Sequence, residues 1–336
     1  MTKVAVVILN YNGKNFLQQF LPSVINFSEG AKIVVADNGS TDGSAEFVEQ
    51  NFSSVALIRV SDNKGFCGGY NFVLKQIEAT YYVLLNSDVE VTQGWLTPII
   101  ELLDNNPTIA AAQPKILSYK SKNKFEYAGA GGGMIDTLGY PFCRGRLFDS
   151  IEEDHGQYND TVEVFWATGA CLFVRAKLYH EMGGLDEDFF AHMEEIDLCW
   201  KLLRAKHKIY YCGQSTVYHV GGGTLSASNP RKTYFNFRNG LSLLIKHQPS
   251  LALLWKFPFR IVLDWAAALH FVLTGSAEHG KAVIIAHLSI VRRLSQEIKK
   301  RKLTQKQINS FDVPNIYKRL IVWDYFYSKK KSFKEL

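Results

Sequence analysis

The sequence is poor in cysteine and has no pair of cysteines in CxxC spacing. Its 336 residues include five cysteines, an odd number. Most of them lie in apolar segments, where a free cysteine behaves as a small buried hydrophobe. The pattern therefore favours a reducing compartment over a disulfide-stabilised fold.

Long hydrophobic runs are also missing. The apolar run over residues 4–9 is too short for the core of a signal peptide, so we interpret it as the first strand. Residues 250–273 contain no uninterrupted apolar stretch of about 18 residues, the length that would predict a membrane-spanning helix. Neither segment is expected to cross a membrane.

The glycine-rich phosphate loops of two large nucleotide-binding classes are absent. A dinucleotide-binding Rossmann domain requires GxGxxG directly after its first strand, and this chain has Asn10-Tyr11-Asn12-Gly13 there. A Walker A sequence is also missing. A glycine cluster at residues 129–133 follows no clear strand and opens no clear helix, so we predict a flexible loop for it.

Strand-like and helix-like segments alternate through the first ninety residues. Apolar runs at 4–10, 32–36, 55–60 and 81–85 alternate with helical patterns at 14–27, 44–51 and 70–79, and Pro22 is expected to split or kink the first helix. Such alternation predicts an α/β fold with a parallel sheet covered on both faces. Further on, a helix is expected at 95–103 and strands at 109–117, 162–166, 171–174, 210–212 and 216–218, with 119–160 irregular.

The buried strand at 81–85 ends in Asn86-Ser87-Asp88, which makes this stretch the first candidate site. A carboxylate at the carboxyl end of such a strand points into the crevice where α/β sheets bind ligands. Asp88 also supplies the oxygen ligand that hard divalent cations prefer. A simple turn is the alternative, because all three residues are turn formers.

A second candidate site lies at the start of a predicted helix, where acidic residues fill the first turn. Glu194, Glu195 and Asp197 could merely offset the helix dipole. The preceding Phe189-Phe190 pair argues for more, because apolar neighbours desolvate a carboxylate and raise its pKa towards that of a useful general base.

Two basic residues complete the candidates. His219 follows a predicted strand and precedes three glycines, which allow the backbone to approach a bound group closely. Arg238 lies in a helical segment and could either cap carbonyl groups or neutralise a phosphate.

Together these motifs resemble family 2 glycosyltransferases, most closely members of the rhamnosyltransferase type. The motifs, in the family's order and spacing, are Asn10-Tyr11-Asn12, Asp37 to Gly43, Asn63 to Phe66, Asn86-Ser87-Asp88, Gly169-Ala170, Glu194 to Leu198 and His219. The resemblance covers residues 3–245 and implies a GT-A nucleotide-diphospho-sugar transferase fold with a mostly parallel central sheet. It divides the chain into a catalytic domain at 1–225, with a nucleotide-binding half at 1–117 and an acceptor-binding half at 118–225, and a basic helical C-terminal extension at 226–336.

The resemblance also implies roles for individual residues. Asp88 and His219 are expected to hold Mn2+ or Mg2+, and Glu195 to be the catalytic base, with Glu194 and Asp197 as alternatives. Acceptor contacts are expected from Trp166, Gly169 and Ala170. Nucleotide-sugar contacts are expected from Asn10, Tyr11, Asn12, Asp37, Asn38, Asn63, Gly65, Phe66, Asn86, Ser87 and Arg238. Two departures from the family stand out: Asn86 replaces the first aspartate of the DXD motif, and Glu195 replaces an aspartate.

Positive charge is concentrated at the C-terminal end. Residues 290–336 contain 13 Lys and Arg against 4 Asp and Glu, a balance of +9, and the chain as a whole carries +6, so residues 1–289 sum to −3. One side of the helix predicted over 250–273 is apolar and includes Trp255 and Val262, whereas Lys256, Arg260 and Asp264 fall on another side. This helix could pack on the catalytic domain or lie in a membrane interface, and the aromatic residues and basic tail favour the interface.

The chain is therefore expected to be an inverting, metal-dependent glycosyltransferase of surface polysaccharide synthesis. The predicted donor is dTDP-rhamnose or a UDP-hexose, and the predicted acceptor is a glycan or lipid-linked glycan. We expect a cytoplasmic protein at the inner face of the plasma membrane, in peripheral contact with anionic lipid and without a nucleic-acid partner; a homodimer is left open. The alternative is a catalytically silent nucleotide-sugar-binding or membrane scaffold protein, which the altered DXD motif permits.

Overall fold

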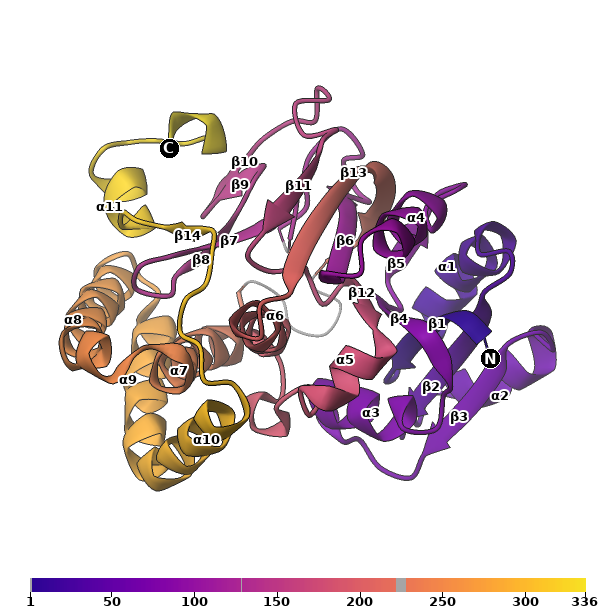
Figure 1. Cartoon of the computed structure of the whole chain (residues 1–336), viewed down its shortest axis with the longest axis horizontal. Coiled ribbons are helices and arrows are strands. Elements are labelled where there is room, and N and C mark those ends of the chain that lie inside the picture. The colour runs from indigo at the N-terminus through magenta and orange to yellow at the C-terminus, as the bar shows by residue number, and fades with distance from the viewer. Residues whose placement is uncertain (1, 128, 222–227) are drawn as a thin grey trace.

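The computed structural model describes residues 2–127, 129–221 and 228–336 and is built on a central sheet (Figure 1). Four parallel strands form one half of this sheet in the order β4-β1-β2-β3. They are β1 (Thr2–Asn10), β2 (Lys32–Asn38), β3 (Ala56–Val60) and β4 (Ala79–Asn86). The predicted parallel sheet is thus confirmed.

The other half of the sheet is mixed. The antiparallel β12 (Cys171–Arg175) lies between β4 and β6 (Ile109–Ser118), and β13 (Lys208–His219) runs parallel to β6. The short strands β5 (Val89–Val91) and β11 (Thr161–Val164) pair antiparallel with β13. Residues 208–219, predicted as two strands, form a single strand whose register shifts between Cys212 and Thr216.

Helices cover both faces of the sheet. Successive side chains of a strand point to opposite faces, and β1 has apolar side chains on both. Val6 and Ile8 of β1 face the helices α1 (Lys14–Phe27), α2 (Ser44–Asn51) and α4 (Thr97–Asn105). Ala5 and Val7 face α3 (Gly65–Leu74), α5 (Ala176–Glu181) and α6 (Glu194–Arg204). The start predicted for α3 was wrong, because this helix begins at Gly65, ahead of Tyr70. Helix α1 contains Pro22 and is not split there, which leaves a kink as the remaining expectation.

The region predicted to be an irregular loop contains most of a second sheet. Its strands are β7 (Gly133–Asp136), β8 (Pro141–Cys143), β9 (Arg146–Leu147) and β10 (Ser150–Ile151), and the C-terminal strand β14 (Ile316–Tyr317) pairs with β7. The glycine cluster at 129–133 is packed here, which corrects the prediction of a flexible loop. Gly131 donates its N–H to Arg144, and a Cβ on Gly133 would collide with the Trp166 ring at 2.1 Å.

The C-terminal segment contributes α7 (Pro230–His247), α8 (Ser250–Leu273), α9 (Ala277–Arg292), α10 (Leu294–Gln307) and α11 (Ile321–Phe326). In Figure 1, α7–α10 gather on the left, and α1 and α2 lie on the right. Helix α8 packs with its polar side inward: Arg260 and Asp264 are buried and paired at 2.8 Å, whereas Trp255 and Val262 are 54% and 63% exposed. None of the helices in the described residues is long and apolar enough to cross a membrane.

Candidate active site

Polar residues gather where the parallel strands β1, β2 and β4 end. The register places Asn10 opposite Asp37 and Leu9 opposite Asn86. The Asn10 amide donates to the Asp37 carboxylate at 3.3 Å, and the other oxygen of Asp37 accepts from the Ser40 N–H at 3.1 Å. Asn10 Oδ1 is buried against Gly13 and has no hydrogen-bond partner among the described residues.

Beside this strand edge, the loop after β3 is held by Asn38. Its side chain donates to Asn63 at 3.1 Å and to the Gly65 carbonyl at 3.0 Å, and it accepts from the Lys64 N–H at 3.1 Å. Gly65 has a φ of 70° and would meet the Phe190 ring if it carried a Cβ. The predicted nucleotide-sugar residues Asn38, Asn63 and Gly65 are therefore brought together in one hydrogen-bonded corner.

Of the remaining predicted nucleotide-sugar residues, Asn12 joins the first cluster because its side chain accepts from the Thr41 N–H at 2.8 Å. Tyr11 lies on the surface and is 49% exposed, and Ser87 is half-buried beside Asp88. Arg238 is not part of this edge.

Asp88 meets His219 at the end of β13. The antiparallel pairing of β5 with β13 places His219 opposite Val89. As a result, Asp88 Oδ1 lies 3.1 Å from His219 Nε2, and Glu126 Oε2 lies 3.4 Å from His219 Nδ1. Burial opposes a charge on this imidazole, but the hydrogen bonds to Asp88 and Glu126 outweigh burial and raise the pKa of His219 to about 10.

The spacing of Asp88 and His219 fits a divalent cation. Two adjacent ligands of an octahedral Mg2+ ion, each at about 2.1 Å, lie about 3 Å apart, and the two atoms here are 3.1 Å apart. A cation would replace the imidazolium proton, and Glu126 would then orient the ring from its other nitrogen. No cluster of three or more His, Cys, Asp or Glu side chains suited to a metal occurs among the described residues. The protein thus offers two ligands, a number that Mg2+ typically completes with phosphate and water.

Helix α6 opens with two neighbouring acidic residues, Glu194, which is buried, and Glu195, which is half-buried. Burial raises the pKa of Glu195 to about 7, although backbone N–H groups, including that of Gly169, oppose the shift. Burial and the neighbouring Glu195 raise the pKa of Glu194 well above its usual range. One carboxylate oxygen of each is buried without a hydrogen-bond partner among the described residues. Strongly shifted carboxyl groups of this kind are candidates for acid–base chemistry.

The third acid of this turn, Asp197, has a different environment. It is fully buried and paired with Lys201 at 2.9 Å, Lys246 at 2.9 Å and His247 at 2.8 Å. Burial opposes its ionisation, but the charges of Lys201 and Lys246 and the hydrogen bond with His247 hold the pKa of Asp197 well below its usual range. The contacts of Asp197 thus belong to a buried cluster of charged and polar side chains, which indicates a structural role.

Arg238 and Asn239 of α7 hold the loop that leads into α6. Arg238 donates to the carbonyls of Asp188 and Phe189 at 2.7 and 2.9 Å, so it caps carbonyls, one of the two roles left open for it. Asn239 donates to the carbonyls of residues 189, 191 and 192. The loop contains three non-glycine residues with positive φ, at 190, 192 and 193. This backbone conformation costs free energy and is maintained only where surrounding contacts stabilise it.

The predicted acceptor residues separate into two groups. Ala170 accepts from the Asn86 N–H at 3.0 Å, and Gly169 lies between the Phe66 ring and Glu194. Trp166 is buried and donates its indole N–H to the Met134 carbonyl at 2.8 Å. Gly169 and Ala170 therefore lie at the candidate site, whereas Trp166 packs against the second sheet.

Sequence reasoning missed Glu126, Asn239 and the partners of Asp197. Glu126 lies in the segment 119–160 that we predicted to be irregular, so no strand end indicated it. Asn239 directly follows Arg238, and only its burial at 0% exposure reveals its role. Lys246 and His247 carry no local sequence signal, because tertiary packing alone brings them to α6.

The sequence is similar to that of known glycosyltransferases. Residues 5–181 match the sequence model described as Glycosyl transferase family 2. The chain is 25% identical over 303 residues to an N-acetylglucosaminyl-diphospho-decaprenol L-rhamnosyltransferase of Mycobacterium tuberculosis, covering 82% of this chain and 94% of that protein. A low-salt glycan biosynthesis hexosyltransferase of Haloferax volcanii is 21% identical over 242 residues, covering 70% and 73% of the two chains.

Solved structures resemble the fold. GalNAc-T7 with UDP, GalNAc and Mn2+ superposes with a TM-score of 0.58 and 14% identity, covering 74% of this chain and 49% of that one. A mannosyltransferase from Pyrobaculum calidifontis in complex with GDP-Man and Mn2+ gives a TM-score of 0.53 and 13% identity, covering 98% and 88%. These similarities show the GT-A fold and confirm the predicted fold class.

Proposed function

The chain belongs to glycosyl transferase family 2, and we propose that it is an inverting, metal-dependent enzyme that transfers a sugar from a nucleotide diphosphate to a lipid-linked glycan. The observation that carries this proposal is the pairing of Asp88 with His219 at one strand edge, together with the raised pKa of the half-buried Glu195. Family membership alone would not distinguish an active enzyme from a silent one.

The donor would be held along the ends of β1, β2 and β4. Asp37 would accept a hydrogen bond from the base or ribose, and Asn10, whose amide donates to Asp37 at 3.3 Å, would hold this carboxylate in place. When bound at Asp88 and His219, a divalent cation neutralises the charge that develops on the leaving diphosphate. Asn38 fixes the loop at Asn63 and Gly65, which would close over the nucleotide sugar.

Glu195 would act as the general base. Its carboxylate accepts the proton of the acceptor hydroxyl, the hydroxyl oxygen bonds to the anomeric carbon, and the bond from that carbon to the diphosphate oxygen breaks. A single displacement of this kind inverts the anomeric centre. A pKa of about 7 leaves a substantial ionised fraction near neutral pH.

The donor is proposed to be dTDP-rhamnose or a UDP-hexose, because similar proteins include an L-rhamnosyltransferase and a hexosyltransferase. The outward apolar side of α8 and the basic C-terminal end support peripheral attachment to an anionic membrane. A silent scaffold is disfavoured, since Asp88, His219 and Glu195 retain the chemistry that transfer requires.

Thermal stabilisation by a panel of nucleotide sugars, with and without Mn2+, tests the proposal. We expect one donor to raise the melting temperature only when Mn2+ is present, and the same donor to support transfer to a lipid-linked saccharide. Absence of stabilisation by every donor in the panel, combined with no transfer, would contradict it.

A further inference from the structure

Cations of the C-terminal helices bind the acidic start of the loop over residues 186–193, which leads into α6. Asp186 Oδ1 accepts from the Asp188 N–H at 3.1 Å and so fixes the first turn of this loop. The same oxygen binds the ammonium group of Lys300 on α10, and Asp186 Oδ2 lies 2.6 Å from Lys246 Nζ on α7. Two helices from the far end of the chain therefore hold the beginning of the loop.

Asp188 is bound in a similar way two residues later. Its carboxylate contacts Lys300 and lies 2.8 Å from the guanidinium of Arg293, the residue that joins α9 to α10. Its carbonyl accepts from Arg238 of α7 at 2.7 Å. Both the backbone and the side chain of Asp188 are thus attached to the C-terminal helices.

The two carboxylates are ionised in this environment. Burial opposes the charge of Asp186, but Lys246 and Lys300 outweigh burial and lower its pKa. Burial also opposes the charge of Asp188, and here Lys300 and Arg293 lower the pKa. Lys300 contributes to both shifts, so it is the cation that the two acids share.

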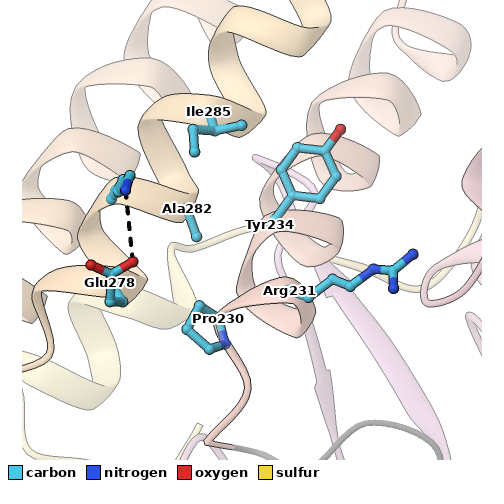
Figure 2. Close-up of a pocket in the computed structure, with 7 residues that line it drawn as sticks. Pro230, Arg231, Tyr234, Glu278, Ala282 and Ile285 are labelled. Carbon is cyan, nitrogen blue, oxygen red and sulfur yellow. Dashed lines mark ion pairs between the residues drawn. The ribbon is translucent and has the colours of Figure 1, made fainter.

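The packing of α9 along α7 brings Arg293 to this position (Figure 2). Tyr234 of α7 donates its hydroxyl to Ser289 of α9 at 3.1 Å. Arg238 and Arg293 follow these two residues by about one helical turn. Both arginines reach Asp188, the first at its carbonyl and the second at its carboxylate. The contact between the two helices therefore sets where the loop is held.

The other end of the loop contacts the proposed base. Residues 190, 192 and 193 have positive φ, so this backbone depends on the contacts that hold it. The Met193 carbonyl accepts from the Asp197 N–H at 3.0 Å and begins α6. Burial raises the pKa of Glu195, and the backbone N–H groups that oppose this shift include that of Met193. A displacement of the loop would therefore move the Glu195 carboxylate.

We propose that Lys300 and Arg293 are positioning residues, which hold the loop over residues 186–193 so that Glu195 keeps its catalytic orientation. The inference rests on the proposed transferase function and adds α10 to its machinery. Isolated ion pairs at a surface contribute little, but Asp186 is only 11% exposed and binds two cations. The side chains of Lys300 and Arg293 are 23% and 25% exposed, so their replacement leaves the hydrophobic core intact.

The test replaces each cation by glutamine and compares it with its neighbour in the sequence. Lys300→Gln should lower kcat by about tenfold, because a misplaced group loses its alignment with the reacting atoms. The Kd for the donor should stay unchanged. Arg293→Gln releases only Asp188 and should have a smaller effect in the same direction. Lys299→Gln and Arg292→Gln remove exposed cations beside these positions and should retain the wild-type kcat.

Restoring the charge of residue 300 separates positioning from damage to the fold. In Lys300→Cys, 2-bromoethylamine alkylates the new thiol, with loss of bromide, and creates an ammonium side chain similar in length to lysine. The five native cysteines are buried and protected from the reagent. We expect kcat to recover after this treatment, with the modification verified by mass spectrometry. Iodoacetamide adds a neutral amide to the same thiol and should not restore kcat.

Hydrogen exchange supplies a measurement that does not depend on activity. Backbone amides at residues 186–193 should exchange faster in Lys300→Gln than in wild type, whereas those of β4 should be unchanged. Exchange at wild-type rates in this loop would overturn the inference, as would unchanged kcat in both Lys300→Gln and Arg293→Gln, or a loss in Lys300→Cys that the verified ammonium does not reverse. Failure of the transferase proposal is distinguishable, because wild-type protein would then transfer no sugar while exchange in the loop still depended on Lys300.

Discussion

The carboxylate of Asp88 and the imidazole of His219 lie 3.1 Å apart although 131 residues separate them in the chain. Their meeting depends on β5 and β13: the first follows Asp88 directly, and the second ends at His219. Because these two strands pair antiparallel, the end of β13 returns to the edge where the parallel strands finish. The Asp88–His219 pair is thus a product of sheet topology, with Glu126 added from a third segment.

The first prediction concerns this pair. Asp88→Ala should abolish the Mn2+-dependent rise in melting temperature produced by the donor, and should lower turnover strongly, because only one protein ligand remains. The change should leave the fold intact, since Asp88 lies at a strand end. Glu90→Ala, two residues further on and half-buried, is the control and should retain both properties. Full wild-type activity in EDTA would refute the metal assignment.

The second prediction concerns nucleotide binding at Asp37. This carboxylate is 4% exposed and is oriented by the Ser40 N–H. Asp37→Ala should weaken donor binding by about 1–3 kcal/mol, the usual cost of leaving such a hydrogen-bonding group unpaired. Calorimetry with the nucleoside diphosphate measures the effect, and Asp62→Ala on the neighbouring exposed loop serves as control. Unchanged affinity of the Asp37 variant would count against a role in donor binding.

The part of this site that could be predicted from the sequence is the set of polar residues at the ends of the parallel strands. Asn10, Asp37 and Asn86 converge because they lie at the carboxyl ends of parallel strands, which share one edge of the sheet. Their placement therefore follows from the alternation of strands and helices. The orientation of α8 was harder to foresee. Its polar side was recognisable, but the network that buries Arg260 requires Tyr140 from the turn between β7 and β8, in a segment where no strand was predicted.

The third prediction concerns the strained loop before α6. Asn239→Ala removes three hydrogen bonds to the carbonyls of residues 189, 191 and 192. Misplacement of the following carboxylates should lower kcat by about tenfold or more while donor affinity stays unchanged. Asn236→Ala, one turn earlier on α7, is the control. Equal loss of donor binding and kcat would indicate general damage to the fold and contradict a positioning role.

The fourth prediction separates a structural acid from a catalytic one. Asp197→Asn removes the acidic partner of Lys201 and one of the two acidic partners of the buried Lys246, which keeps Asp186 at 2.6 Å. The loss of the buried carboxylate should lower the free energy of unfolding by about 3–5 kcal/mol. The pKa of Asp197 is depressed in the folded protein, so its stabilisation is present above the ordinary aspartate pKa of about 4 and is lost as pH falls below it. Urea titrations at several pH values measure this, with the exposed Glu181→Gln as control. A variant as stable as wild type would contradict the structural assignment.

The last prediction identifies the base. Glu195→Gln keeps the shape of the side chain but removes its basicity, so donor binding should survive while transfer falls by about two to four orders of magnitude. Burial raises the pKa of Glu195 to about 7, and the base is active when ionised. The wild-type rate should therefore rise with pH up to about 7 and then level off, a limb that the variant should lack.

Glu194→Gln and Asp197→Asn are the comparisons for this assignment. Glu194 shares the apolar surroundings of Glu195, and burial raises its pKa as well. The Glu194→Gln variant therefore tests whether Glu195 alone serves as the general base. We expect a smaller loss of transfer for Glu194→Gln, and for Asp197→Asn a loss that follows its lowered stability. Near wild-type transfer by Glu195→Gln, together with a folded but inactive Asp197→Asn, would move the role of base to Asp197. That outcome would require the ion cluster with Lys201, Lys246 and His247 to open during turnover.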